Sequence, residues 1–319
     1  MLRQLLQFLS PAGEHARLSV LLFHRVRPQR DELFPDEPDA RAFETLLGNL
    51  KRWCNILPLP AAIQRLRSGA LPARSLCITF DDGYADNCTV ALPLLTQAGV
   101  RATFFVATGY LGGGRMWNDT VIEAVRAARG PSLDLTDIGL GVYTLATLDE
   151  RRSAIAALLG KLKYAPSEAR EASADAIARR VGAELPRNLM MTPEQVRTLH
   201  SAGMTIGAHT VTHPILAGAS EAHARREIIE SKRVLETLVG DPVALFAYPN
   251  GKPRQDYAGA HVELVRSAGF DGACSTAWGV ASRASDVFQI PRFTPWDREA
   301  WRFGLRLAQN LRRTAYATA

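Results

Sequence analysis

The sequence has no apolar stretch long enough to cross a membrane, which takes about 18 residues. Residues 1–10 mix leucine with arginine and glutamine, and no small-residue cleavage site follows them, so we do not interpret them as a signal peptide. Together these absences predict a cytoplasmic protein.

Cysteine is scarce and shows no metal-binding spacing. The four cysteines are isolated from one another, and Cys77 lies inside an apolar run. This usage predicts reduced, mostly buried thiols and argues against a disulfide-stabilised or cysteine-zinc fold.

The sequence also lacks a strong excess of either charge and any segment with the composition of a linker. The chain carries 38 basic and 32 acidic residues, a net charge of +6, and the basic residues are dispersed without a nucleic-acid-binding motif. We therefore expect no nucleic-acid partner. Hydrophobic content of 47% is ordinary for a globular protein. With no repeat and no linker rich in Pro, Gly or Ser, we expect residues 1–319 to form one domain.

Two adjacent carboxylates end a short apolar run. Leu76–Phe80 has the composition of a buried parallel strand, and Asp81, Asp82 and Gly83 follow it directly. A turn at Gly83 lets both carboxylates approach one site, where like charges are unfavourable unless a cation, hydrogen bonds or a shifted pKa compensates. Taken alone, these residues are equally consistent with a solvated turn.

Two histidines end a second apolar run. His209 and His213 follow Met204–Ala208, and a glycine within this stretch and a proline after it argue against a helix. One carboxylate and two imidazoles form a usual ligand set for a catalytic metal with open positions for water. The two strand ends together therefore indicate a metal site.

The motifs resemble those of a known family. Thr79-Phe80-Asp81-Asp82-Gly83-Tyr84, followed by His209-Thr-Val-Thr-His213, is similar to the first two motifs of the NodB-type polysaccharide deacetylases, the fourth carbohydrate esterase family. The resemblance covers about residues 18–295. It implies an α/β fold, a distorted (β/α) barrel, together with a divalent metal and the removal of acetyl groups from N-acetylated sugars.

The resemblance also implies roles for individual residues. Asp82, His209 and His213 would bind one divalent ion, for which we expect zinc, and Asp81 would be the general base. The backbone N–H of Tyr84 would donate to the oxyanion.

His24 is the candidate general acid. It directly follows the apolar run Leu18–Phe23 and matches a position at which some branches of the family carry a catalytic histidine. The family's late Leu-x-His motif is not visible after Gly272–Ser275, which favours this assignment. A hydrogen-bonded core histidine is the alternative.

The third motif is only partly matched. Tyr248-Pro249-Asn250-Gly251 resembles its Tyr-Pro-x-Gly form but lacks the preceding arginine that orients the catalytic aspartate. Arg292 is our candidate substitute, and a surface or core-rim arginine is the alternative. Tyr248, Trp117 and Trp278 are candidates for stacking on sugar faces, with a helix cap at Asp119 as the other interpretation of the Trp117 region.

Two further segments accompany the barrel. Helical periodicity between about residues 120 and 200 predicts a helical insertion, and residues 297–313 have the pattern of a basic amphipathic helix. That helix either docks on the barrel or contacts anionic lipid at a membrane surface.

The expected function is metal-dependent hydrolysis of N-acetyl groups on a sugar or polysaccharide. The partner would be an N-acetylated glycan or a lipid-linked sugar. Two alternatives remain open: a metal-dependent amidohydrolase for a small non-sugar amide, and a non-catalytic carbohydrate-binding protein. An exposed aromatic groove would favour sugar, and a closed small pocket would favour the small amide.

Overall fold

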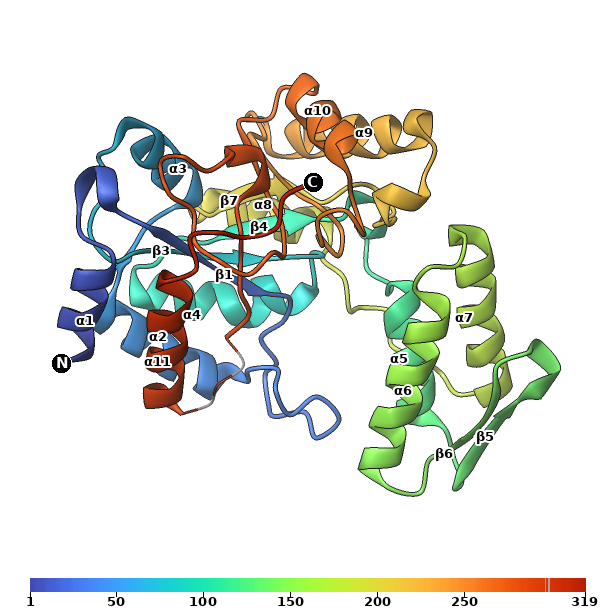
Figure 1. Cartoon of the computed structure of the whole chain (residues 1–319). Coiled ribbons are helices and arrows are strands. Elements are labelled where there is room, and N and C mark those ends of the chain that lie inside the picture. Colours follow the sequence, from blue (N-terminus) through green and yellow to red (C-terminus); the bar gives the residue numbers. More distant parts are fainter. Residues whose placement is uncertain (296, 298) are drawn as a thin grey trace. The chain divides into compact units, whose positions relative to one another are not determined.

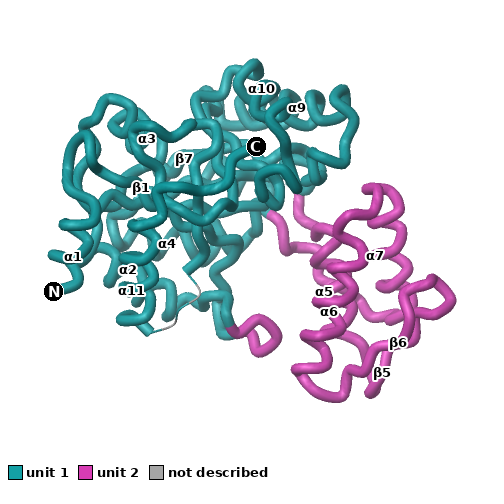
Figure 2. The backbone as a smooth tube through the Cα atoms, in the orientation of Figure 1, with its two compact units in different colours: residues 1–30, 36–111, 191–319 teal, residues 31–35, 112–190 magenta. Residues whose placement is uncertain are grey.

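The computed structural model describes residues 1–295, 297 and 299–319 (Figure 1). They divide into two compact units, shown in Figure 2. The first contains residues 1–30, 36–111 and 191–319, and the second contains residues 31–35 and 112–190. Residues 191–200, which we expected within the insertion, belong to the first unit. The single domain over 1–319 stays a prediction.

The first unit is built on a parallel sheet curled into a half-barrel, which confirms the expected distorted (β/α) barrel. The strand order is β1-β3-β4-β7-β8-β9, with the short β2 also paired to β3. Strands β1 and β3 are buried over their whole length, which explains why their sequences are mostly apolar on both faces. The strands are β1 (Leu18–Phe23), β2 (Asn55–Ile56), β3 (Ser75–Phe80), β4 (Thr103–Val106), β7 (Thr205–Ala208), β8 (Leu245–Ala247) and β9 (Gly272–Cys274).

A late segment bridges the gap between the outer strands β9 and β1. The N–H of Ile290 donates to the carbonyl of Ala273 at 2.9 Å, and the N–H of Phe293 donates to the carbonyl of Val20 at 3.0 Å. Arg292 lies between these two bridging residues and is completely buried. Closure of the barrel therefore brings this arginine into the interior.

The alternation of side chains along β3 decides which residues face the interior. Cys77 packs in one cluster with Phe105 of β4, Leu245 of β8 and side chains of helix α3 (Leu59–Ser68). Ile78 and Phe80 pack in a different cluster, with side chains of helices α2 (Ala40–Trp53) and α9 (Glu221–Val239). Because neighbours along a strand point to opposite faces, Thr79 and then Asp81 follow Cys77 on the interior side.

The helices of the first unit begin and end at residues with the expected chemistry. The Thr192 side chain caps α8 with Pro193 at its first position, and Gly99, with φ of 66°, ends α4. A π-helical turn, Asn87–Ala91, precedes α4. The helices are α1 (Leu2–Leu9), α2 (Ala40–Trp53), α3 (Leu59–Ser68), α4 (Leu92–Ala98), α8 (Pro193–Ser201), α9 (Glu221–Val239), α10 (Gly259–Ser267) and α11 (Ala300–Leu311).

The C-terminal helix α11 is docked on the first unit beside α1 (Figure 1). It starts three residues later than expected. Gly304 allows the close approach, because a Cβ atom there would meet the Leu2 side chain. Phe303 and Leu307 are buried, whereas Trp301 and Leu305 remain exposed. Contact of this helix with lipid stays a prediction.

None of the helices in the described ranges combines the length and the apolar composition that crossing a membrane requires.

The second unit contains three helices and one antiparallel hairpin around its own apolar core. We had expected helices alone. Strands β5 and β6 are four residues each, and burial alternates along both. The Ser-Leu-Asp-Leu sequence of β5 has the two-residue period of a half-buried strand, which the helical assignment overlooked. The elements are α5 (Trp117–Ala127), β5 (Ser132–Leu135), β6 (Gly141–Thr144), α6 (Leu148–Leu162) and α7 (Ser167–Val181).

The start of α5 differs from the expected cap at Asp119. The N-cap position is Met116, and the Asp119 carboxylate accepts a hydrogen bond from the Met116 N–H at 3.0 Å. Asp119 thus satisfies the helix terminus from the third helical position, which places the start three residues earlier than a cap at Asp119 would.

We expect Gly207→Ala to destabilise the protein by about 1–3 kcal/mol, the usual cost of overpacking a core. A Cβ at residue 207 would lie 2.5 Å from Cδ1 of the buried Phe105 ring and 3.1 Å from the Leu245 carbonyl oxygen. Urea unfolding measures the loss.

Gly48→Ala is the matched control, because nothing lies within 4 Å of its added Cβ in helix α2. There alanine should stabilise by about 0.5–1 kcal/mol. Equal stability of the two variants would contradict the packing argument.

Candidate metal centre and catalytic site

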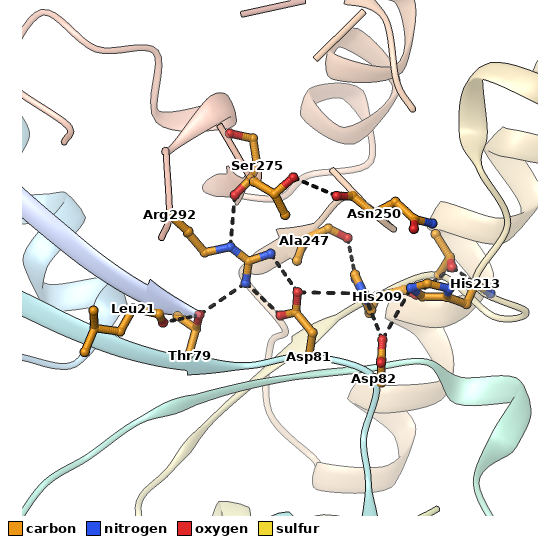
Figure 3. A network of polar contacts seen from close by, with 12 residues as sticks. Leu21, Thr79, Asp81, Asp82, His209, His213, Ala247, Asn250, Ser275 and Arg292 are labelled. Carbon is orange, nitrogen blue, oxygen red and sulfur yellow. Dashed lines mark hydrogen bonds and ion pairs between the residues drawn. The ribbon is translucent and has the colours of Figure 1, made fainter. Parts of the chain in front are cut away.

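One carboxylate and two imidazoles meet at the carboxyl ends of β3 and β7 (Figure 3). Oδ1 of Asp82 lies 3.4 Å from Nε2 of His209 and 3.3 Å from Nε2 of His213. Ligand atoms from the three residues all lie within 4.8 Å of one another. The structure therefore brings together all three residues that we expected to bind a metal.

The donor set fits a divalent cation. Oδ1 of Asp82 is buried and accepts no hydrogen bond within the described part of the chain. Nδ1 of His209 lies 2.7 Å from the carbonyl oxygen of Ala247, so a proton on Nδ1 leaves Nε2 available as a ligand. An orphaned carboxylate oxygen between two imidazole nitrogens is a good position for a cation.

Burial and the neighbouring carboxylates shift the pKa values of the two histidines. Burial disfavours the charged form of His213 and lowers its pKa to about 4, so this imidazole is neutral near pH 7. Burial also disfavours the charged form of His209, but Asp81 and Asp82 outweigh this effect and raise its pKa. A proton on His209 and a divalent cation would therefore compete for the same carboxylates.

Left-handed backbone conformations gather at this site. The φ angles are 75° at Asp82, 65° at Thr210, 54° at His213 and 59° at Asn250, and none of these residues is glycine. They follow the carboxyl ends of β3, β7 and β8. Such conformations persist only where surrounding contacts hold them, and they are common at functional sites.

Asp81 is held by Arg292. Nη1 and Nη2 of Arg292 donate to Oδ1 and Oδ2 of Asp81, each at 2.7 Å, and Nε donates to the Ser275 carbonyl at 3.0 Å (Figure 3). Both partners are almost fully buried. Burial raises the pKa of Asp81, but Arg292, followed by His209, lowers it more, so the carboxylate stays ionised.

His24 stands at the end of β1 and is exposed. The side-chain amide of Asn87, which follows the Asp81–Asp82 turn, donates to the His24 carbonyl at 2.9 Å and fixes the backbone there. Burial raises the pKa of Asp82, but His213, His209 and His24 together lower it more, so this carboxylate also stays ionised. Its role as the acid stays a proposal.

Tyr248, which we expected to contact the sugar, is enclosed by other side chains. Tyr248 is fully buried, its ring stacks on Tyr257 at 3.9 Å, and its hydroxyl donates to the Phe288 carbonyl at 3.1 Å. A ring enclosed in this way cannot stack on a sugar, so that prediction for Tyr248 is wrong. The strand composition that places Tyr248 at a strand end does not reveal that a second tyrosine covers it.

The roles that we predicted for Trp117 and Tyr84 are not tested by the structure. Trp117 belongs to the second unit, where the Arg170 guanidinium lies 4.9 Å from its ring centroid. The Tyr84 ring lies 4.6 Å from the Arg25 guanidinium. The oxyanion role of the Tyr84 N–H and the sugar contact of Trp117 stay predictions.

A buried carboxylate on helix α9 was missed from the sequence. Glu227 is 4% exposed and accepts hydrogen bonds from the loop between His209 and His213. A signal was available, because Glu227 falls in the helical repeat of the buried Ala224, Ile228 and Ser231. A charged residue at such a position indicates a specific polar partner.

The half-barrel and its site define the class of protein. Functional side chains at the carboxyl ends of successive parallel strands are typical of barrel enzymes. The polysaccharide deacetylase family model matches residues 68–129 and 147–273, more than half of the chain. The chain belongs to the polysaccharide deacetylase family, as the motifs indicated, and is a hydrolase acting on carbon–nitrogen bonds other than peptide bonds.

Individual relatives are distant in sequence. YxkH of Bacillus subtilis (strain 168) is 18% identical over 277 residues, which are 87% of this chain and 71% of that protein. The Streptococcus pyogenes deacetylase PplD, solved with acetate, is 19% identical with a TM-score of 0.58, covering 88% of this chain and 92% of that one. IcaB from Ammonifex degensii is 18% identical with a TM-score of 0.58, covering 94% and 98%. These two structures confirm the fold.

We expect Arg292→Leu to destabilise the protein by about 3–5 kcal/mol, because it leaves the Asp81 carboxylate buried and uncompensated. Since the pKa of folded Asp81 is lowered, the pair stabilises the fold above the pKa of an unfolded aspartate, about 4. This contribution disappears as the pH falls through the lowered value. Urea unfolding at several pH values measures it.

The exposed ion pair of Arg283 with Glu14 provides the control, and Arg283→Leu should cost less than about 1 kcal/mol. Adding Asp81→Asn to Arg292→Leu should restore part of the loss, because it removes the unpaired charge. Similar losses for the two arginine variants would contradict the assignment.

Proposed function

We propose that this chain removes N-acetyl groups from an N-acetylated glycan or a lipid-linked sugar, with one divalent ion, zinc, at Asp82, His209 and His213. The observation that carries this proposal is the orphaned Oδ1 of Asp82 between two imidazole nitrogens, beside a second carboxylate. Membership in the polysaccharide deacetylase family supports the substrate class.

Each protein group has a separate task in this reaction. A bound divalent ion would lower the pKa of a water molecule and polarise the acetyl carbonyl. Asp81 accepts the proton that the attacking water loses, and Arg292 keeps that carboxylate ionised and oriented. The N–H of Tyr84 donates to the oxygen that becomes negative during the attack.

His24 completes the proton balance. An amine leaves readily only when its nitrogen is protonated as the C–N bond breaks, so an acid is needed near that atom. His24 is exposed at the end of β1, where an incoming sugar can reach it. Acetate and the free amine are the products.

The buried pair of Asp81 and Arg292 favours catalysis over binding alone. Burying two charges costs free energy that a purely carbohydrate-binding site would not need to spend. The other alternative, a small non-sugar amide, uses the same catalytic groups and differs only in substrate.

Acetate release by the purified protein tests the proposal. N-acetylglucosamine oligomers, lipid-linked N-acetylated sugars and simple acetamides are compared before chelation, after chelation and after zinc is restored. We expect release from the sugars, loss on chelation and recovery with zinc. Release from the acetamides alone would establish the small-amide alternative, and activity that survives full removal of metal would refute metal dependence.

Asp81→Asn and His209→Ala should separate the base from the metal site. Asparagine keeps the size of Asp81 but cannot accept the proton, so we expect about 10²–10⁴-fold slower hydrolysis with the metal retained. His209→Ala should lose the metal itself. Elemental analysis and acetate release measure the two properties. Wild-type activity in Asp81→Asn would assign the base to another group, and full metal content in His209→Ala would exclude this ligand set.

His24→Ala should impair the amide reaction much more than hydrolysis of an activated acetyl ester. A phenolate leaves without protonation, so the ester does not need the acid. Rates on an N-acetylated sugar and on a nitrophenyl acetate, with metal content as the control, give the comparison. Equal losses on the two substrates would show that His24 is a structural residue.

A further inference from the structure

We infer that Glu227 on helix α9 is a positioning residue that holds the ligand loop, residues 209–213, in the conformation that binds the metal. This inference rests on the proposed metal site. It assigns a role to a residue that lies outside the ligand set and the catalytic groups, and it explains why a carboxylate is buried in a helix face that is otherwise uncharged.

The contacts of Glu227 are concentrated on this loop. Oε2 accepts hydrogen bonds from the N–H groups of Val211 and Thr212, each at 2.8 Å, and Oε1 accepts one from the Thr212 hydroxyl, also at 2.8 Å. Nε2 of His223, one turn earlier on α9, lies 3.8 Å from Oε1. The buried carboxylate is therefore compensated mainly by the loop.

The loop needs such support because its backbone is strained at both ends. Thr210 and His213 have φ angles of 65° and 54°. Two carbonyl groups of the loop are held by the chain after β4. The N–H of Thr108 donates to the Thr210 carbonyl at 3.1 Å, and the N–H of Gly109 donates to the Val211 carbonyl at 2.8 Å. Glu227 satisfies the N–H groups of the same loop, so the loop is held from both sides.

The consequence for the metal follows from chain connectivity. His213 comes directly after Thr212, and its own N–H donates to the Thr210 hydroxyl at 3.1 Å. Without Glu227, the partly buried N–H groups of Val211 and Thr212 lose their acceptor, and the loop relaxes toward ordinary φ values. The imidazole of His213 then moves away from Asp82, whereas His209, held by the Ala247 carbonyl, stays in place.

Zinc affinity and the cobalt absorption spectrum of the full chain test this inference. Loss of a group that orients a metal ligand usually weakens binding by about 10–100-fold, and we expect this for Glu227→Ala. A chelator competition measures the affinity, and the visible spectrum of bound Co²⁺ reports the ligand geometry. Glu227→Gln should bind nearly as tightly as the wild type, because its amide oxygen can accept both N–H groups and its NH2 group can donate to the Thr212 hydroxyl oxygen.

Glu236→Ala is the matched control on the same helix. Glu236 accepts a hydrogen bond from the Val243 N–H at 3.1 Å and has no part in the ligand loop. Urea unfolding of the metal-free proteins compares the stability losses. We expect Glu236→Ala to lose stability without losing zinc affinity or changing the cobalt spectrum.

The outcomes distinguish this inference from the proposed function. A wild-type chain that binds neither ion would refute the metal site itself. Wild-type affinity in Glu227→Ala, or an equal loss in Glu227→Gln, would overturn the positioning role. If Glu227→Ala fails to fold, Thr212→Val is the second variant. It removes only the hydroxyl hydrogen bond to Glu227, so it should weaken zinc binding by a measurable factor that is smaller than the one expected for Glu227→Ala. Unchanged affinity in that variant would also overturn the inference.

Discussion

The buried pair of Arg292 and Asp81 is the interaction on which the rest of the site depends. Two charges taken out of water need several partners to become stable. Here a bidentate contact, the Thr79 hydroxyl at 3.2 Å and the Ser275 carbonyl at 3.0 Å surround the guanidinium, and the Phe105 ring centroid lies 5.5 Å away. Strands β3, β4 and β9 must all be in place, because they contain or directly precede these partners. The charge pair thus links the closure of the barrel to the geometry of the site.

The same pair determines how Asp81 can act. A general base works best when its pKa lies near the working pH, whereas Arg292 lowers the pKa of Asp81. The site thus gains a fully ionised, rigidly oriented carboxylate and gives up some of its proton affinity. That exchange is reasonable when the attacking water is itself made more acidic, which is the contribution expected of a divalent ion. The proposed role of Asp81 as the base therefore depends on the proposed metal ligands beside it.

Sequence alone could predict the parts of the molecule that follow directly from local pattern. Short buried strands show as mostly apolar runs, so the sequence predicts β1 and β3 to within one residue, and the residues after them become candidates. Because the carboxyl ends of parallel strands share one edge, Asp82 and His209 could be expected to meet. The pattern says much less about helix faces: in α9, Ile228 is fully buried, whereas the adjacent Ile229 is 45% exposed.

What sequence could not determine depends on contacts between distant segments. Arg292 reaches Asp81 across more than two hundred residues, through a bridging segment that forms only isolated pairs with its neighbours. The burial of Tyr248 depends on Tyr257 lying flat against it. The hold of Glu227 on the ligand loop depends on how α9 packs beside β7. In each case the residue type was visible, but its partner was set by tertiary packing, which local propensity does not encode. The left-handed conformations of Asp82 and His213 could not be predicted for the same reason, because only the packed structure can hold the backbone there.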